Sequence, residues 1–177
     1  MTSMKPIFSP TRLLVFAFTW MLAAPFAQAQ LDRVYDLQGD NVSGAVVERS
    51  KDGVKLEKAG AIKDFKAGEI SKIMFEGDPA SLTKARGFAL DGQYDQALTE
   101  LKKVKLNTIK RDVIKEEVAF YYAMCEAELA LSGQGKIDDA ARRLIEFAGA
   151  NRDSWHFYEA GKLLGDLALA SNNSEQA

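Results

Sequence analysis

The stretch from Ala85 to Leu101 decides the fold and reads ARGFALDGQYDQALTEL. Its apolar residues recur at helical spacing on both sides of the pair Asp91-Gly92. A glycine directly after such a run is a common end of a helix, because glycine adopts the left-handed conformation needed there. The stretch therefore predicts two short helices, over 79–90 and 94–104, joined by a tight turn.

Helical spacing continues to the end of the chain. Before the first helix, Asp78 is placed to act as its N-cap, and Pro79 suits its first turn. Further helices are expected over 110–132, 137–148 and 154–171. Breaks between the helices are expected near Asn107, at 133–135, at 149–151 and at Asn172-Asn173.

Small and large residues in these helices follow a pattern that resembles the tetratricopeptide repeat (TPR) family, in which small residues let paired helices pack closely. The first copy is Ala85, Phe88, Gly92, Tyr94, Ala97 and Leu101. The middle copy is Ala127, Gly135, Ile137, Ala140 and Leu144, and the third is Leu164-Gly165, Ala168, Asn172 and Ala177. The resemblance covers about residues 78–177 and implies an array of helical hairpins. A helical bundle with coincidental spacing is the alternative.

The repeats are expected to be loose, and the last one incomplete. The anchor alanines Ala97, Ala140 and Ala177 are 43 and 37 residues apart, against a standard period of about 34. Ser174 is expected to cap the second helix of the third copy. The array would then contain about two and a half repeats. A stripe on helix 154–171 would then lack its partner and favour self-association. That stripe is Gly161, Leu164, Gly165 and Ala168.

Residues 31–77 have the residue pattern of short β-strands. Segment 54–58 alternates apolar and charged residues, as a half-buried strand does. The other expected strands are 34–37, 42–47, 62–65 and 73–75, separated by glycine-containing turns. Five short strands with tight turns predict a small antiparallel barrel that packs on the helices, because so small a unit is marginal alone.

This segment resembles the SH3-like and Sm-like small barrels, on its strand count and on the glycine within Val42-Ser43-Gly44. Sm-type RNA binders carry an Arg-Gly pair near the last strands, where this chain has Glu76-Gly77. The expected fold class is α+β, with a barrel-like domain over 30–78 and a TPR-like domain over 79–177.

Residues 1–29 have the order of a secretory signal. Lys5 and Arg12 precede the apolar run LLVFAFTWMLAA, and Ala27-Gln28-Ala29 is a small-x-small cleavage pattern. Cleavage after Ala29 would export the protein to the periplasm or beyond the cell, with no stable membrane span left. A retained anchor helix is the alternative, although the apolar run is shorter than the 20 or so residues of a typical span.

The remaining composition bears on partners and chemistry. Without residues 1–29 the chain has 21 basic and 25 acidic residues, a net charge of −4, which disfavours nucleic-acid binding. The single cysteine, Cys125, allows no disulfide within the chain and is expected to be buried, and the single histidine, His156, is expected to pack or lie at the surface. Glu116-Glu117 and Asp138-Asp139 are expected on solvated helix faces.

No convergent set of nucleophile, base and stabiliser is recognisable, so we expect no catalytic residues, no cofactor and no metal. The resemblance to TPR proteins implies a scaffold that binds a protein or peptide partner along the first helix of each repeat. The residues expected on that face are Arg86, Leu90, Lys162, Asp166 and Leu169. The alternatives are an accessory subunit or fragment of an envelope enzyme, and a nucleic-acid binder that uses an Sm-like barrel.

Overall fold

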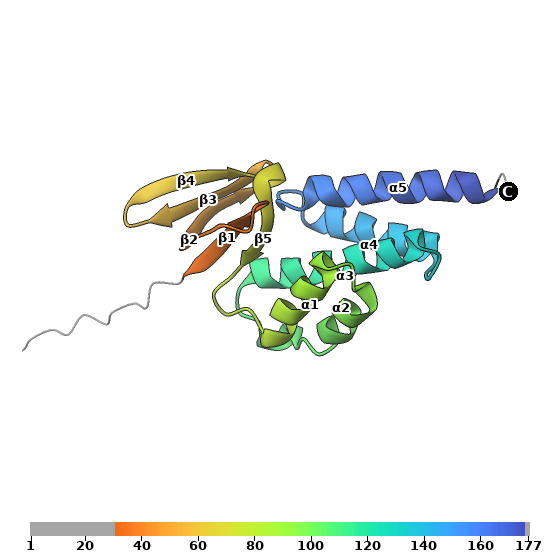
Figure 1. Cartoon of the computed structure of the whole chain (residues 1–177), viewed down its shortest axis with the longest axis horizontal. Helices are drawn as coiled ribbons and strands as arrows, with labels where there is room; N and C mark the ends of the chain where they lie inside the picture. The colour runs from red at the N-terminus through yellow and green to blue at the C-terminus, as the bar shows by residue number, and fades with distance from the viewer. Residues whose placement is uncertain (1–30, 176–177) are drawn as a thin grey trace, which may run out of the picture.

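The computed structural model describes residues 31–175, with side chains described to Asn172, and it has a five-stranded sheet at one end and five α-helices at the other (Figure 1). The expected signal sequence 1–29 and the anchor Ala177 lie outside the described residues. None of the described helices is both long enough and apolar enough to cross a membrane. The α+β fold class is confirmed.

All five expected strands form. They are β1 (Asp32–Asp36), β2 (Asn41–Ser50), β3 (Gly53–Lys58), β4 (Ala61–Lys66) and β5 (Ile70–Met74), with a short 3₁₀ helix, η1 (Ala67–Glu69), before the last. Neighbouring strands are antiparallel, in the order β4-β3-β2-β1-β5. Because β4 and β5 do not pair, the sheet is open, and the expectation of a closed barrel is wrong.

β2 pairs with β1 up to Gly44 and with β3 from Ala45, and its pairing with β3 has a register shift between Val46 and Glu48. Close approach of β2 and β3 requires glycine at position 44. A Cβ atom there would lie 2.3 Å from the carbonyl oxygen of Glu57, far inside contact distance. The strand pattern and this glycine together place Val34, Leu56 and Ile73 in the core of the sheet.

The helices are α1 (Ala80–Leu90), α2 (Tyr94–Leu101), α3 (Asp112–Leu131), α4 (Ile137–Ala150) and α5 (Phe157–Glu175), with a 3₁₀ turn, η2 (Leu106–Thr108), before α3. Consecutive helices pack as hairpins, α1 with α2 and α3 with α4. In addition α3 contacts α1, α2 and α5 (Figure 1). The long helix α3 is therefore the centre of the helical part.

Two expectations about helix ends are wrong. Asp78 does not cap α1, which has Pro79 at its N-cap position without a side-chain cap, because the Asp78 carboxylate is engaged by Arg86 and by the backbone of Phe75. The break expected at Asn172-Asn173 is absent, and α5 continues to Glu175, so Ser174 does not begin a new helix. Asparagine lowers helix propensity only modestly, and no glycine or proline follows to stop the helix.

One core runs from the sheet into the helices, and polar contacts reinforce the junction. Asp32 of β1 is 1% exposed and binds the Arg111 guanidinium through both oxygens, at 2.7 and 3.1 Å. The same carboxylate accepts hydrogen bonds from the backbone N–H groups of Val46 and Glu76. A second pair joins Arg49 to Glu116 of α3 at 2.8 Å. The sheet is thus held against the start of α3.

Candidate functional site

The residues expected on a binding face fall into two groups. Four of them lie wholly or partly at the surface, with Leu90 46% and Leu169 66% exposed and the Lys162 and Asp166 side chains 76% and 39% exposed. Arg86 is only 1% exposed, so the expectation that it faces a partner is wrong. Its guanidinium is used inside the protein.

Arg86 is the centre of a buried charged cluster, which comprises Asp78, Arg86, Glu117 and His156. The guanidinium donates to Asp78 at 2.9 Å and to Glu117 of α3 at 3.1 Å. Glu117 is fully buried, so the expectation that it lies on a solvated helix face is also wrong. Its other oxygen lies 3.1 Å from His156 Nε2 and accepts a hydrogen bond from the Trp155 indole at 3.1 Å.

Aromatic rings enclose His156, which is 1% exposed. The imidazole stacks on Phe120, with ring centroids 3.5 Å apart, and lies 3.7 Å from the Trp155 ring. Its Nδ1 atom is 3.2 Å from Glu159 of α5. The cluster therefore ties the loop after the sheet, α1, α3 and the start of α5 to one point.

Charges balance within this cluster when the imidazole carries a proton, with two carboxylates facing two cations. Burial lowers the pKa of His156, but the charge and hydrogen bond of Glu117, with Glu159, outweigh it, and the net pKa is raised above the usual 6.5. Burial raises the pKa of Glu117, yet His156, Arg86 and Trp155 more than reverse this, and its net pKa is lowered. Asp78 has fewer donors, and burial raises its pKa despite Arg86.

A raised pKa for His156 in the folded protein gives a pH dependence with a definite sign. The stabilisation by the protonated ring is complete below the unfolded-state pKa of about 6.5 and is lost as pH rises through the higher folded-state value. We expect the free energy of unfolding, measured with urea between pH 6 and 8, to fall with pH in the natural protein. His156→Gln should remove most of that slope, and an unchanged slope in this variant would contradict the assignment.

Cys125 has no polar role in this cluster. Its side chain is fully buried on α3, as expected from the sequence, and burial raises the pKa of the thiol to about 12. The residues described also contain no group of three or more His, Cys, Asp or Glu placed to hold a metal ion.

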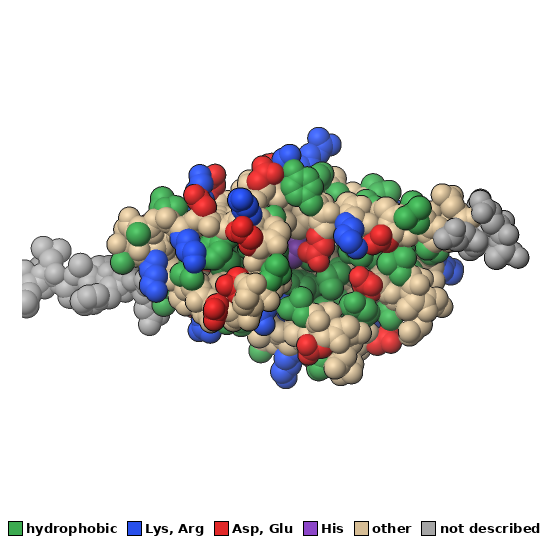
Figure 2. Space-filling view, turned by 45° about the horizontal axis from the view of Figure 1, so that its top comes forward, with side chains coloured by type: hydrophobic (Ala, Val, Ile, Leu, Met, Phe, Trp, Pro, Cys, Tyr) green, Lys and Arg blue, Asp and Glu red, His purple; other side chains and the backbone are tan. Residues whose placement is uncertain are grey.

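At the surface, Lys162, Asp166 and Leu169 share one side of α5, which we call the α5 face. Lys162 and Asp166 form an ion pair at 2.9 Å. That hydrogen bond raises the pKa of Lys162, and the charges of Glu128 on α3 and Glu159 add to the effect. Lys162 is thus paired with Asp166 and lies in the field of two further carboxylates. Figure 2 shows hydrophobic side chains in a hollow in the middle of the molecule, with charged side chains around it.

A second surface feature lies between α3 and α4 and was not expected from the sequence. We call it the α3–α4 groove; it consists of two hollows of about 420 and 430 Å³ that share Arg143 and Glu146. Residues of the first hollow include Leu98, Glu126, Leu129, Lys136, Asp139 and Arg142. Residues of the second include Leu106, Lys115, Val118, Ala119, Tyr122, Phe147 and Ala150.

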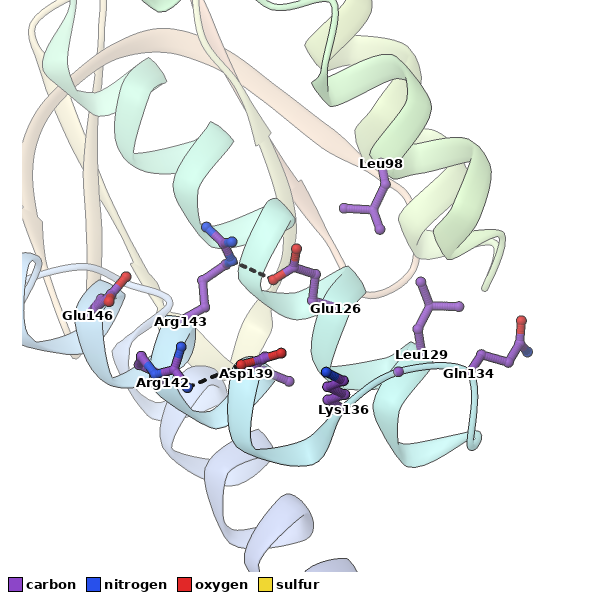
Figure 3. Close-up of a pocket in the computed structure, with 11 residues that line it drawn as sticks. Leu98, Glu126, Leu129, Gln134, Lys136, Asp139, Arg142, Arg143 and Glu146 are labelled. Carbon is purple, nitrogen blue, oxygen red and sulfur yellow. Dashed lines mark hydrogen bonds and ion pairs between the residues drawn. The ribbon is translucent and has the colours of Figure 1, made fainter.

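The two hollows differ in character. In the first, Arg143 is ion-paired with Glu126 and Arg142 with Asp139, which neutralises most of its charge (Figure 3). The second is mainly apolar, and the Arg143 guanidinium lies over the Tyr122 ring, 5.1 Å from its centroid, at the boundary between them. The groove therefore offers an apolar recess next to a neutral, polar one.

Comparisons with family models, with curated proteins and with solved structures gave no match for this chain. The functional argument therefore depends on the residues and contacts described above.

Proposed function

We propose that this protein is a non-catalytic, exported scaffold of the cell envelope, similar to TPR proteins, which binds a protein or peptide partner through its helices. The observation that carries the proposal is the burial of the small residues that the repeat pattern places at helix crossings in its first two copies. Ala85, Ala97 and Ala127 are fully buried and Ala140 is 2% exposed. At such positions any larger side chain would push paired helices apart.

The order of contacts supports the same proposal. Hairpins α1–α2 and α3–α4 are followed by α5, and the first helices contact one another, α1 with α3 and α3 with α5. The turn glycine Gly92 has the positive φ of 73° that the expected helix end requires. Export is proposed from the signal-like order of residues 1–29. For the sheet, the five short antiparallel strands and the close approach of β2 and β3 at Gly44 support a relation to the small barrels.

The α5 face is the proposed partner surface within this scaffold. Leu169 is a large apolar residue left 66% exposed, next to an ion pair that is itself open to solvent. A contiguous apolar patch rimmed by polar residues marks surfaces that bind other proteins, and we propose that Leu169 is the centre of such a patch. Gly161, Gly165 and Ala168 of the same helix are also exposed, so a second copy of the chain is a possible occupant.

To test this, protein of residues 30–177 carrying Lys162→Glu with Leu169→Asp should capture partners from the source organism at least fivefold less well than the natural sequence. The loss follows from removing an apolar contact and reversing a charge on one face. The measurement is affinity capture with quantitative mass spectrometry, with light scattering to detect self-association.

A matched control lies on the sheet. Ile62 is 62% exposed and precedes Lys63 on β4, so Ile62→Asp with Lys63→Glu makes the same chemical change elsewhere. The control should retain capture. Equal capture by both double variants, at equal melting temperatures, would count against the α5 face.

A further inference from the structure

We propose that the α3–α4 groove binds an acidic peptide segment that inserts one bulky apolar side chain into the apolar hollow. The inference rests on the proposed function and names the chemistry of one partner. It concerns a surface separate from the α5 face.

The apolar hollow is the first part of the argument. Its walls come from α3 and α4, with Val118, Tyr122 and Phe147 among them, and Leu106 of η2 forms its edge. A volume of about 430 Å³ is within the usual range of sites that bury a ligand group. Ala119 and Ala150 are exposed within it, so none of the described side chains fills the space above them.

Charge along the edge of this hollow indicates the rest of the ligand. Segment 102–110, which contains Leu106, carries four lysines and no acidic residue. The ammonium groups of Lys102, Lys105 and Lys110 are exposed, and none of them forms an ion pair with the described residues. Leu106 is the residue of this segment that lines the hollow, and Lys105 precedes it directly in the chain. Carboxylates that flank the inserted side chain on the Leu106 side would therefore meet a lysine-rich segment. Complementary charge of this kind favours encounter and selects partners.

Two other anionic partners fit less well. A nucleic-acid backbone would bring a continuous row of phosphates against Glu126, Glu146 and Asp139 along the groove, whereas a peptide side chain seated in the apolar hollow is next to only one of these, Glu146. A membrane surface is flat, whereas Tyr122 and Phe147 line a hollow, and Leu106 is the one large apolar side chain of segment 102–110 that is mostly exposed. A peptide can place a single side chain into such a recess.

The experiment uses fluorescence anisotropy with residues 30–177 and a labelled peptide, Glu-Glu-Leu-Phe-Glu-Glu. It should bind at least tenfold more tightly than Lys-Lys-Leu-Phe-Lys-Lys or Glu-Glu-Ser-Ser-Glu-Glu. Lys105→Glu with Lys110→Glu should weaken binding at least tenfold, and Ala119→Trp, which fills the hollow, should do the same. Lys58→Glu with Lys63→Glu makes the same change of net charge on the sheet and should leave binding unchanged.

Absence of binding by the acidic peptide, equal binding of the basic one, or no effect of the groove variants would overturn the inference. The inference would also be overturned if the protein sedimented with vesicles of phosphatidylcholine and phosphatidylglycerol but did not bind the acidic peptide. If the acidic peptide does not bind but the α5-face double variant still captures fewer partners, only the groove inference is wrong. If the α5-face double variant also captures partners as well as the natural sequence does, the scaffold proposal is wrong too.

Discussion

Arg86→Glu should destabilise the protein by more than about 5 kcal/mol, enough to unfold many domains of this size. The new carboxylate would lie among Asp78 and Glu117, which are 5% and 0% exposed in their side chains. The carboxylates of Asp78 and Glu117 and the new one at position 86 would then have only the His156 imidazole as a buried cation. Removing one partner of a buried ion pair costs about 3–5 kcal/mol, and reversing its charge adds repulsion to that loss.

The measurement is urea unfolding followed by circular dichroism. Because Arg86→Glu is expected to be largely unfolded, Arg86→Lys provides a graded test, since one ammonium group cannot reproduce the forked contacts to both carboxylates. Arg142→Glu is the matched control. Arg142 is 66% exposed in its side chain and pairs with Asp139, so its reversal should cost less than about 1 kcal/mol. Arg86→Glu with the melting temperature of the natural protein would disprove the role of the cluster.

Asp32→Ala is expected to have the second largest effect, a loss of about 3–5 kcal/mol. This carboxylate receives both arms of Arg111 and two backbone N–H groups, from Val46 and Glu76. Truncation removes the acceptor of the Val46 and Glu76 N–H groups and the charge partner of Arg111, which keeps its hydrogen bond to the Glu76 carbonyl. Unsatisfied buried donors each add a penalty of their own.

Asp32→Asn should lower the free energy of unfolding by less than Asp32→Ala does, because the amide oxygen can still accept a hydrogen bond from one of the backbone N–H groups. Arg111→Ala tests the same junction from the helical side and should lower stability in the same direction. Asp64→Ala, on the exposed side of β4, is the control and should change little. A loss for Asp32→Ala no greater than for Asp64→Ala would show that the junction does not depend on this contact.

Local patterns in the sequence predicted the elements well. Alternation predicted the strands, and helical spacing with Gly92 predicted the first hairpin, because both depend on neighbours along the chain. Closure of the sheet depends on whether β4 reaches β5, a long-range geometry that strand patterns do not encode. The end of α5 was missed because two asparagines weaken a helix without stopping it.

For the charged cluster, the sequence contains one signal, the position of Glu117. Residues three and four positions from Glu117 are Val113, Ile114, Phe120 and Tyr121, which places Glu117 on the apolar side of α3. Its neighbour Glu116 is turned toward Arg49 of the sheet. The sequence could not identify the partners of Glu117, since Arg86 on α1 and His156, just before α5, are 31 and 39 residues away. The α3–α4 groove was missed for the same reason, as its walls combine three separate helices and η2.

The junction at Asp32 also constrains the order in which the protein can fold. Asp32 and Arg111 are 79 residues apart in the chain, Arg49 and Glu116 are 67 apart, and Asp52 receives its hydrogen bond from Tyr158, 106 residues later. Contacts so distant in sequence form late, because a long loop must close before they are made. In a chain synthesised from its N-terminus, the whole sheet is therefore made before Arg111, Glu116 and Tyr158, the residues that tie it to the helical part. Until Arg111 is synthesised, the sheet lacks the ion pair that holds it against the start of α3.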